Sequence, residues 1–187
     1  ARGDHVVAAF VPSCGHCGPC AASRPALCEP GFAANSAGTL LSGSRRLHDA
    51  QGDVHHHLGV SGFADHAVLA ANSLVRVPGD LPFAEAALFG CAVITGVGAV
   101  VNTAAMPRGS TVAVVGLGGV GLAALLAARM LDAPHIVAID MNDAKLAVAR
   151  EFGATATVNA ADPQAAEQVR DLTGGGVAFA FEMAGAA

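Results

Sequence analysis

The chain of 187 residues is long enough for one large domain or two small ones, and 53% of its residues are hydrophobic. Its net charge of −5 and its ten scattered basic residues argue against nucleic acid or an anionic membrane as a partner. The apolar stretch of residues 93–105 is interrupted by glycines and too short to cross a bilayer, so we expect no membrane partner.

No signal peptide is visible at the start of the chain, which favours a cytoplasmic protein. The first residue is Ala1 rather than Met, and Ala187 follows directly on an expected strand. We therefore expect a fragment of a longer protein.

A cysteine-rich loop follows a first expected strand at residues 4–10. Gaps of two, two and seven residues separate its four cysteines, which are Cys14, Cys17, Cys20 and Cys28. Four thiolates can surround one zinc ion tetrahedrally, and Gly15, Gly18 and Pro19 supply turn geometry around the metal. A closed four-sulfur shell leaves no position for substrate, so residues 14–28 predict a structural zinc lobe.

Two disulfides are the competing interpretation of these four cysteines. Without a secretory signal, and with a nucleotide-binding pattern further along the chain, a reducing compartment and zinc are favoured. His16 lies inside the loop, but four sulfurs already fill the shell, so we expect this side chain to be solvated.

The segment after the lobe contains few signals of regular structure. Residues 32–52 are polar and glycine-rich and predict a long surface excursion, whereas residues 60–70 predict a strand. Three consecutive histidines at residues 55–57 cannot all face one ion on a strand, because adjacent side chains point to opposite faces. We therefore expect no metal site at these three histidines.

The composition changes near Gly90. Before it, residues 74–78 predict a short strand and residues 82–88 a helical turn, and after it residues 93–105 predict a helix of small residues. From residue 111 onward strands alternate with helices, which calls for a parallel sheet with crossover connections. The expected strands are residues 111–115, 136–139, 155–158 and 177–181, and the expected helices are residues 122–131, 144–152 and 165–173. Gly153 is expected to cap the second of these helices.

A glycine-rich turn follows the first of these strands directly. Its residues are Gly116, Leu117, Gly118, Gly119, Val120 and Gly121. Gly116 permits a tight turn, Gly118 has no side chain to block a pyrophosphate, and Gly121 lets the helix pack close to the sheet. The helix N-terminus then offers free N–H groups and a positive dipole end to phosphates. The turn predicts a dinucleotide site.

Asp140 ends the next strand, nineteen residues after Gly121, and can accept hydrogen bonds from an adenosine ribose. The competing interpretation is that the glycines only form a tight turn in an ordinary α/β domain. That interpretation gives no reason for an acidic residue at position 140. NAD is favoured over NADP, because the carboxylate repels a 2′-phosphate and Met141 and Asn142 supply no arginine. Lys145, the only lysine, could reach the ribose or phosphate, or could equally be a solvated helix residue.

Together these motifs resemble those of the zinc-dependent, medium-chain alcohol dehydrogenase family. The resemblance rests on the four-cysteine lobe, on Gly90–Cys91 with Thr95 and Gly96, on the glycine turn and on Asp140, and it covers essentially all 187 residues. It implies an α/β fold in two parts. Residues 1–90 would form a partial GroES-like, β-rich catalytic domain, and residues 91–187 the N-terminal part of a Rossmann doubly wound parallel sheet.

The resemblance also implies roles that spacing alone does not give. Cys91 would be one of three protein ligands of a catalytic zinc, and an exposed, glycine-flanked helix start would favour its thiolate. From the sequence alone, Cys91 could equally be a small buried residue of a hydrophobic core. Thr95 and Val120 would line the nicotinamide pocket, although both could simply pack in a core.

The activity implied by the resemblance is hydride transfer between an alcohol, or its aldehyde product, and NAD. One alternative is a thiol-dependent formaldehyde dehydrogenase of the same family, acting on an S-(hydroxymethyl)thiol, and another is a non-catalytic zinc and nucleotide-binding module. The full-length protein would form a homodimer or tetramer. The family's other catalytic zinc ligands would precede Ala1, and about three of six sheet strands would be present. We therefore expect this chain alone to be inactive.

Overall fold

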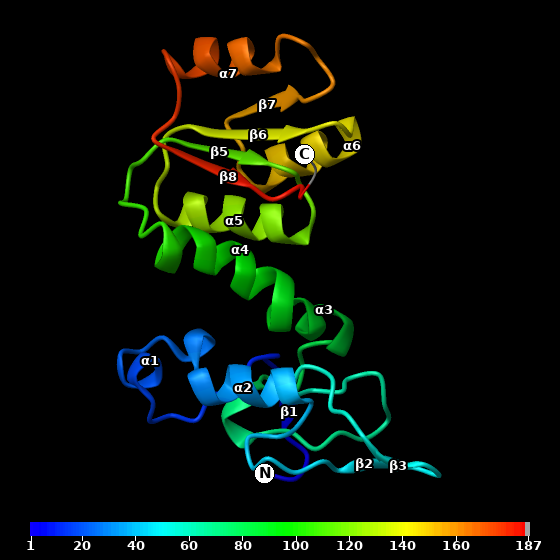
Figure 1. Cartoon of the computed structure of the whole chain (residues 1–187). Coiled ribbons are helices and arrows are strands. Elements are labelled where there is room, and N and C mark those ends of the chain that lie inside the picture. The colour runs from blue at the N-terminus through cyan, green and yellow to red at the C-terminus, as the bar shows by residue number, and fades with distance from the viewer. Residues whose placement is uncertain (186–187) are drawn as a thin grey trace. The chain divides into compact units, whose positions relative to one another are not determined.

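The chain divides into two compact units, Ala1–Cys91 and Ala92–Ala187, and the computed structural model describes residues 1–185. In the first unit, β1 (His5–Ala8) pairs antiparallel with β4 (Leu74–Val77). A separate hairpin joins β2 (Leu47–Asp49) to β3 (Gly52–Val54) (Figure 1). Both strand pairs are short, so much of this unit consists of loops that run between small elements.

Short helices surround the cysteine loop of the first unit. They are α1 (Gly18–Ala21), a 3₁₀ turn (Pro25–Leu27) and α2 (Glu29–Ala37). α2 ends at Gly38, which has a left-handed φ of 63°. The prediction of a surface excursion over residues 32–52 is therefore wrong for the part that α2 occupies and for the β2–β3 hairpin.

The prediction of a strand over residues 60–70 is also wrong. This segment has no regular structure, and a 3₁₀ turn (Ala71–Ser73) leads from it into β4. Of the three consecutive histidines only His56 is buried, and its Nε2 accepts a hydrogen bond from the backbone N–H of Arg46 at 3.0 Å. This side chain therefore has a structural contact within its own unit.

A long helical run contains the boundary between the two units. It comprises α3 (Phe83–Leu88), a π-helical segment (Phe89–Val93), α4 (Ile94–Gly98) and a second π-helical segment (Ala99–Thr103). At 21 residues (Phe83–Thr103) the run is long and apolar enough to cross a membrane, because it begins well before the helix expected over residues 93–105. Length and composition alone are weak grounds for a span, and Val100 of this run is fully buried in the core of the second unit.

The second unit is built on a parallel sheet with the strand order β7-β6-β5-β8. Its strands are β5 (Val112–Val115), β6 (Ile136–Asp140), β7 (Ala156–Asn159) and β8 (Phe179–Glu182). Val112 lies opposite Ile136 on one side and Phe179 on the other. The described part of the sheet therefore has the four strands expected from the sequence pattern, one more than the resemblance implied, and the predicted α/β class with a parallel sheet is confirmed.

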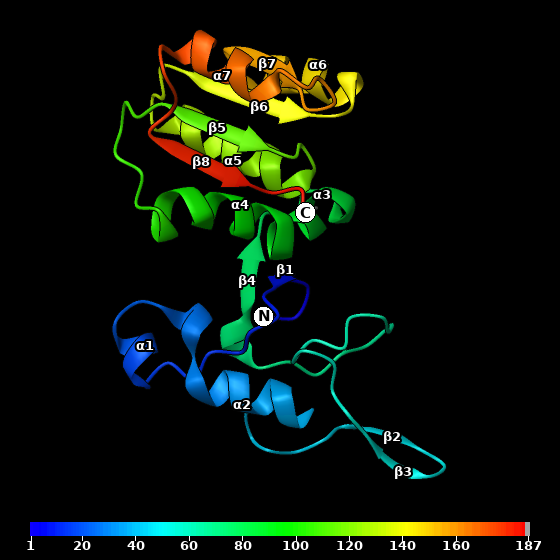
Figure 2. The same ribbon diagram turned by 45° about the horizontal axis from the view of Figure 1, so that its top comes forward.

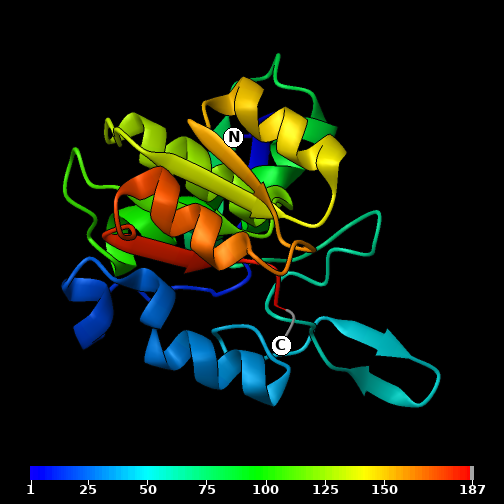
Figure 3. The ribbon, with the colours of Figure 1, turned by 90° about the horizontal axis from the view of Figure 1, so that it is seen from above.

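Helices cover both faces of this sheet. They are α5 (Gly119–Met130), α6 (Asp143–Phe152) and α7 (Ala165–Thr173), and Gly153 ends α6 as predicted, with a φ of 110°. Val112 and Val114 face a core that contains residues of α5 and α6, whereas Ala113 faces the opposite side with Val137. Figure 2 shows α4 and α5 on one side of the sheet, and Figure 3 shows α7 lying over the other. Because the four described strands of this sheet are parallel, their carboxyl ends lie along one edge, where the glycine turn and Asp140 also lie.

Candidate functional site

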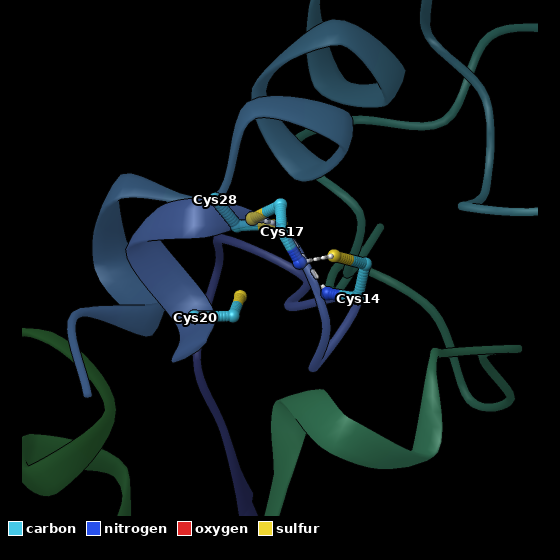
Figure 4. A group of neighbouring side chains, drawn as sticks. All are labelled: Cys14, Cys17, Cys20 and Cys28. Carbon is cyan, nitrogen blue, oxygen red and sulfur yellow. Dashed lines mark hydrogen bonds between the residues drawn. The ribbon is translucent and has the colours of Figure 1, made fainter. Parts of the chain in front are cut away.

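The four cysteines of the loop converge on one point in the first unit. Cys14 comes from the loop, Cys17 is the N-cap of α1, Cys20 lies within α1, and Cys28 is the N-cap of α2. Their sulfur atoms all lie within 4.8 Å of one another, and Figure 4 shows the side chains directed inward from these elements. The structure therefore brings together all four residues that the spacing singled out.

The separations of these sulfur atoms fit a shared metal better than disulfides. A tetrahedral zinc with Zn–S bonds of about 2.3 Å places its sulfurs roughly 3.8 Å apart. The sulfurs of Cys17 and Cys28 are 3.9 Å apart, which is far from the roughly 2.05 Å of a disulfide bond. No disulfide joins any of the residues that the structure describes, and all four thiols are available to one ion.

Backbone N–H groups point at two of the sulfurs. Cys28 Sγ accepts from the N–H of Cys14 at 3.2 Å and of Gly31 at 3.3 Å, and Cys14 Sγ accepts from the N–H of Cys17 at 3.3 Å. The backbone N–H of His16 is the main group that lowers the pKa of the Cys14 thiol from 9.0 to about 6. Burial raises the pKa of the Cys20 thiol to about 11. Such N–H donors stabilise thiolate charge, which is the form that binds zinc.

Gly31 is a residue of this lobe that the sequence motifs did not identify. A Cβ atom at this position would lie 1.9 Å from the carbonyl oxygen of Pro12 and 3.3 Å from Cys28 Sγ. Gly15, with a φ of 83°, has the left-handed backbone expected of a turn, but Gly18 does not and would have open space around a Cβ. The turn that begins at Gly18 therefore does not depend on glycine, whereas Gly31 is needed for a close backbone approach.

The glycine turn between β5 and α5 has a distinct steric environment at each glycine. Gly116 adopts a φ of 88°, and a Cβ at Gly121 would lie only 1.8 Å from the carbonyl oxygen of Gly116. Gly118 is exposed, precedes the first residue of α5, and would place a Cβ in open space. The fold thus needs Gly116 and Gly121, while nothing in the described chain requires a glycine at position 118.

Asp140 lies directly beside this turn. Its Oδ2 accepts a hydrogen bond from the backbone N–H of Leu117 at 2.7 Å, and its Oδ1 accepts from the N–H of Asn142 at 2.9 Å. Lys145 Nζ is 3.6 Å from Oδ2. Burial acts to raise the pKa of Asp140, but these two N–H groups and the ammonium of Lys145 outweigh it, and the pKa lies below its ordinary value. Asp140 is therefore an ionised acceptor at the edge of the sheet.

Val120 and Thr95 are the two residues predicted to line a nicotinamide pocket. Val120 lies just after the glycine turn, and Thr95 lies on the neighbouring helix α4. Val120 is the second residue of α5 and is half-buried, and Thr95 lies on α4 and is exposed. Gly96 explains how these helices approach, because a Cβ there would lie 2.2 Å from the carbonyl oxygen of Val120. The structure places both residues in the unit that carries Asp140.

Cys91 is exposed at the end of the first unit. It lies inside the π-helical segment (Phe89–Val93), in the interior of the long helical run. The expected position at a helix start is therefore wrong, and a helix dipole gives no account of its chemistry. Gly90 has a packing role instead, since a Cβ there would lie 2.7 Å from the carbonyl oxygen of Ala8.

An apolar groove of about 580 Å³ lies in the first unit, with Phe10, Leu27, Phe32 and Leu58 among its lining residues. None of the predicted site residues lines it. Leu27 and Glu29, which flank Cys28 in the chain, line the groove, but Cys28 itself does not.

The match to a family model falls on the second unit. Residues 119–187 match the model of the zinc-binding dehydrogenases. The S-(hydroxymethyl)glutathione dehydrogenase of Saccharomyces cerevisiae is 38% identical over 189 residues, which cover 98% of this chain and 49% of that protein. The chain thus spans about half the length of this relative.

Solved structures show the same similarity over both units. An alcohol dehydrogenase zinc-binding domain protein from Burkholderia ambifaria is 38% identical with a TM-score of 0.85, covering 100% of this chain and 50% of that one. A benzyl alcohol dehydrogenase from Acinetobacter calcoaceticus is 34% identical with a TM-score of 0.80, covering 98% of this chain and 49% of that one. The resemblance predicted from the sequence motifs is confirmed.

Proposed function

We propose, from this similarity to the zinc-binding dehydrogenases, that the whole protein is a zinc-dependent oxidoreductase that transfers a hydride between an alcohol, or its aldehyde product, and NAD. In this proposal residues 1–90 belong to a GroES-like catalytic domain and residues 91–187 to a Rossmann cofactor domain. The chain described here supplies one half of the relatives' length. It would lack part of the catalytic site and be inactive alone.

The observation that carries the proposal is the hydrogen bond between Asp140 and the glycine turn. A dinucleotide needs a phosphate-binding turn and a ribose-binding acid at the same sheet edge, and here the two are joined at 2.7 Å. Gly116 and Gly121 let α5 begin directly behind the strand, so its first N–H groups point at the space where phosphates would bind. Asp140 retains lone pairs for ribose hydroxyls.

The residues of this chain would bind the pyrophosphate, position the nicotinamide and hold one side of a catalytic zinc. When bound, NAD would accept the hydride, and a catalytic zinc would supply positive charge at the substrate oxygen. Gly118 and Gly119 would leave room for the pyrophosphate, and Thr95 and Val120 would place the nicotinamide. Cys91 would be one ligand of the catalytic zinc, because its thiol is exposed and takes no part in the cysteine cluster.

The cysteine cluster would hold a second, structural zinc. Cys14, Cys17, Cys20 and Cys28 provide four sulfurs and leave no position for a substrate. Their ion would connect the loop, α1 and the start of α2. The lobe would therefore depend on the metal for its fold and loosen when a chelator removes it.

The substrate would be a small alcohol or aldehyde, as the names of the relatives suggest. The full-length protein would be a cytoplasmic homodimer or tetramer, without nucleic acid or membrane as partner. The packing of Val100 in the core of the second unit supports a helical run that lies within the protein rather than a bilayer.

An S-(hydroxymethyl)thiol is the second candidate substrate. It is favoured by the 38% identity to the S-(hydroxymethyl)glutathione dehydrogenase. Assays of the full-length protein with formaldehyde, in the presence and absence of glutathione, would separate the two candidates. Turnover that requires glutathione would favour the S-(hydroxymethyl)thiol as substrate. Turnover of simple alcohols without glutathione would favour a small alcohol or aldehyde.

The test of the proposed function is NADH formation by the full-length protein with a panel of alcohols, combined with its zinc content. We expect turnover, two zinc ions per chain, and loss of NAD binding by about tenfold or more in Asp140→Ala. A non-catalytic zinc and nucleotide-binding module would instead contain one zinc and form no NADH with any substrate. That result would contradict the proposal.

A further inference from the structure

The side chain of Asn159 is hydrogen-bonded to the turn of residues 141–143, which follows β6. Asn159 ends β7 and lies opposite Asp140 in the sheet register. Its Nδ2 donates to Asp143 Oδ1 at 2.8 Å and to the carbonyl oxygen of Met141 at 3.4 Å. Its Oδ1 accepts from the backbone N–H of Ala161 at 2.9 Å. The amide thus joins the end of one strand to both sides of the turn that leaves the next.

The same turn holds the carboxylate of Asp140 in place. Asn142, in the middle of the turn, donates its backbone N–H to Asp140 Oδ1 at 2.9 Å. The second oxygen is held by the N–H of Leu117 at 2.7 Å. If the turn moved, the N–H of Asn142 would be withdrawn, and the carboxylate would keep only one of its two backbone donors.

We propose that Asn159 is a positioning residue for the adenosine end of the cofactor: its amide holds the turn of residues 141–143, and that turn sets the orientation of Asp140. The inference rests on the proposed function, in which Asp140 binds the ribose. Asn159 acts through Asp140 and the turn rather than by touching the cofactor.

Only an amide suits the contacts of Asn159. The side chain offers N–H donors to Met141 and Asp143 and an acceptor to Ala161. Aspartate has the same shape but no donor when ionised, and it would place a second carboxylate beside Asp143. Alanine would remove the contacts without adding charge.

The charges around the turn set the expected cofactor preference. Asp140 and Asp143 are both acidic, and the nearby cation Lys145 is 3.6 Å from Asp140 Oδ2. A fixed carboxylate at Asp140 repels the 2′-phosphate of NADP. Releasing the turn would let this carboxylate rotate away, so NAD binding would weaken more than NADP binding.

Two variants of the full-length protein separate positioning from charge. We expect Asn159→Ala to raise the dissociation constant for NAD by about tenfold, to leave kcat within about twofold, and to narrow the preference for NAD over NADP. We expect Asn159→Asp to weaken NAD binding to a similar degree while keeping or widening that preference, because it adds a negative charge. Asn102→Asp, at an exposed position of the second π-helical segment, is the matched control and should change neither constant.

The measurements are titrations of NAD and NADP, steady-state kinetics and thermal unfolding of each variant. If Asn159 had a purely structural role, both substitutions would lower the unfolding temperature and leave the ratio of the dissociation constants for NAD and NADP unchanged. That result would overturn the inference. Retention of the wild-type NAD affinity by both variants would also overturn it. A wild-type protein that binds neither cofactor would overturn the proposed function itself, and the inference with it.

Discussion

Asp140 Oδ2 lies 2.7 Å from the backbone nitrogen of Leu117, so the acid at the end of β6 is bonded to the turn that ends β5. Two neighbouring strands of a parallel sheet are thereby joined at their carboxyl ends by a side chain as well as by the strand ladder. The glycine turn and Asp140 are thus held together before any ligand binds. Changes of pH, of single glycines and of bound ligands can test this arrangement separately.

The ionisation of Asp140 should make a defined contribution to stability. Its pKa is depressed in the folded protein, so its contribution is present above its ordinary pKa of 3.8 and is lost as the pH falls through the folded-state value. We expect Asp140→Asn to lower the free energy of unfolding by about 1–2 kcal/mol near neutral pH. Urea unfolding at several pH values should find this difference unchanged above about pH 5 and progressively smaller as the pH falls through 3.8 towards the folded-state pKa.

The control for this series is Asp80→Asn, which changes an exposed aspartate of the first unit. It should shift stability by less than about 0.5 kcal/mol at any pH. If the effect of Asp140→Asn disappeared well above pH 3.8, the depressed pKa and its cause would both be wrong.

Two glycines of the turn should separate folding from cofactor binding. Gly121→Ala would place a Cβ 1.8 Å from the carbonyl oxygen of Gly116, so we expect a loss of about 1–3 kcal/mol or more in the free energy of unfolding. Gly118→Ala meets open space and should leave stability nearly unchanged. The same methyl group would occupy the space proposed for the pyrophosphate, and NAD affinity should fall by about tenfold or more. Unfolding curves and NAD titrations of both variants check the prediction, and equal NAD affinity in Gly118→Ala would contradict the proposed phosphate site.

The zinc lobe contains a matched pair of glycines as well. Gly31→Ala would bring a Cβ to 1.9 Å from the carbonyl oxygen of Pro12 and disturb the N–H that bonds to Cys28 Sγ. We expect a loss of about 1–3 kcal/mol and faster release of zinc to a chelator. Gly18→Ala lies in the same lobe with open space around the added methyl, so it should retain zinc as the wild type does. Chelator-release kinetics and hydrogen exchange over residues 12–37 measure both effects.

Cys91 provides a test of the proposed catalytic zinc. Cys91→Ser in the full-length protein should abolish turnover, lower the zinc content from two ions to one, and leave NAD affinity within about twofold. Ala92→Ser is the neighbouring control and should retain both metals. Measurable turnover by Cys91→Ser would show that Cys91 is not a ligand of a catalytic zinc.

The sequence predicted the second unit well because its signals are local and strong. The apolar run before Gly116 is a strand of the sheet, α7 spans residues 165–173 as expected, and Gly153 ends α6. Asp140 could be placed because parallel strands end at one edge. Asn159 could not, because a single asparagine at a strand end forms no pattern, and its partners Met141 and Asp143 are known only from the register of β6 and β7.

The first unit was predicted less well because tertiary contacts override its local signals. α2 contains Gly31 and Asn35, which are poor helix formers, and it is stabilised by the Cys28 N-cap and by the close approach of Gly31 to Pro12. The helical run was expected to be short because glycines indicate breaks. Gly90 and Gly96 instead permit backbone contacts with Ala8 and Val120, and the helix continues through both.

The close contact at Gly96 has a consequence for thermostabilising this protein. Exchanging helix glycines for alanine is a common way to raise melting temperature. At position 96 the new methyl group would lie 2.2 Å from the carbonyl oxygen of Val120 and displace the first turn of α5. Gly98 on the same helix has only Asn102 Nδ2 within reach, at 3.9 Å, and is the safer position for such an exchange.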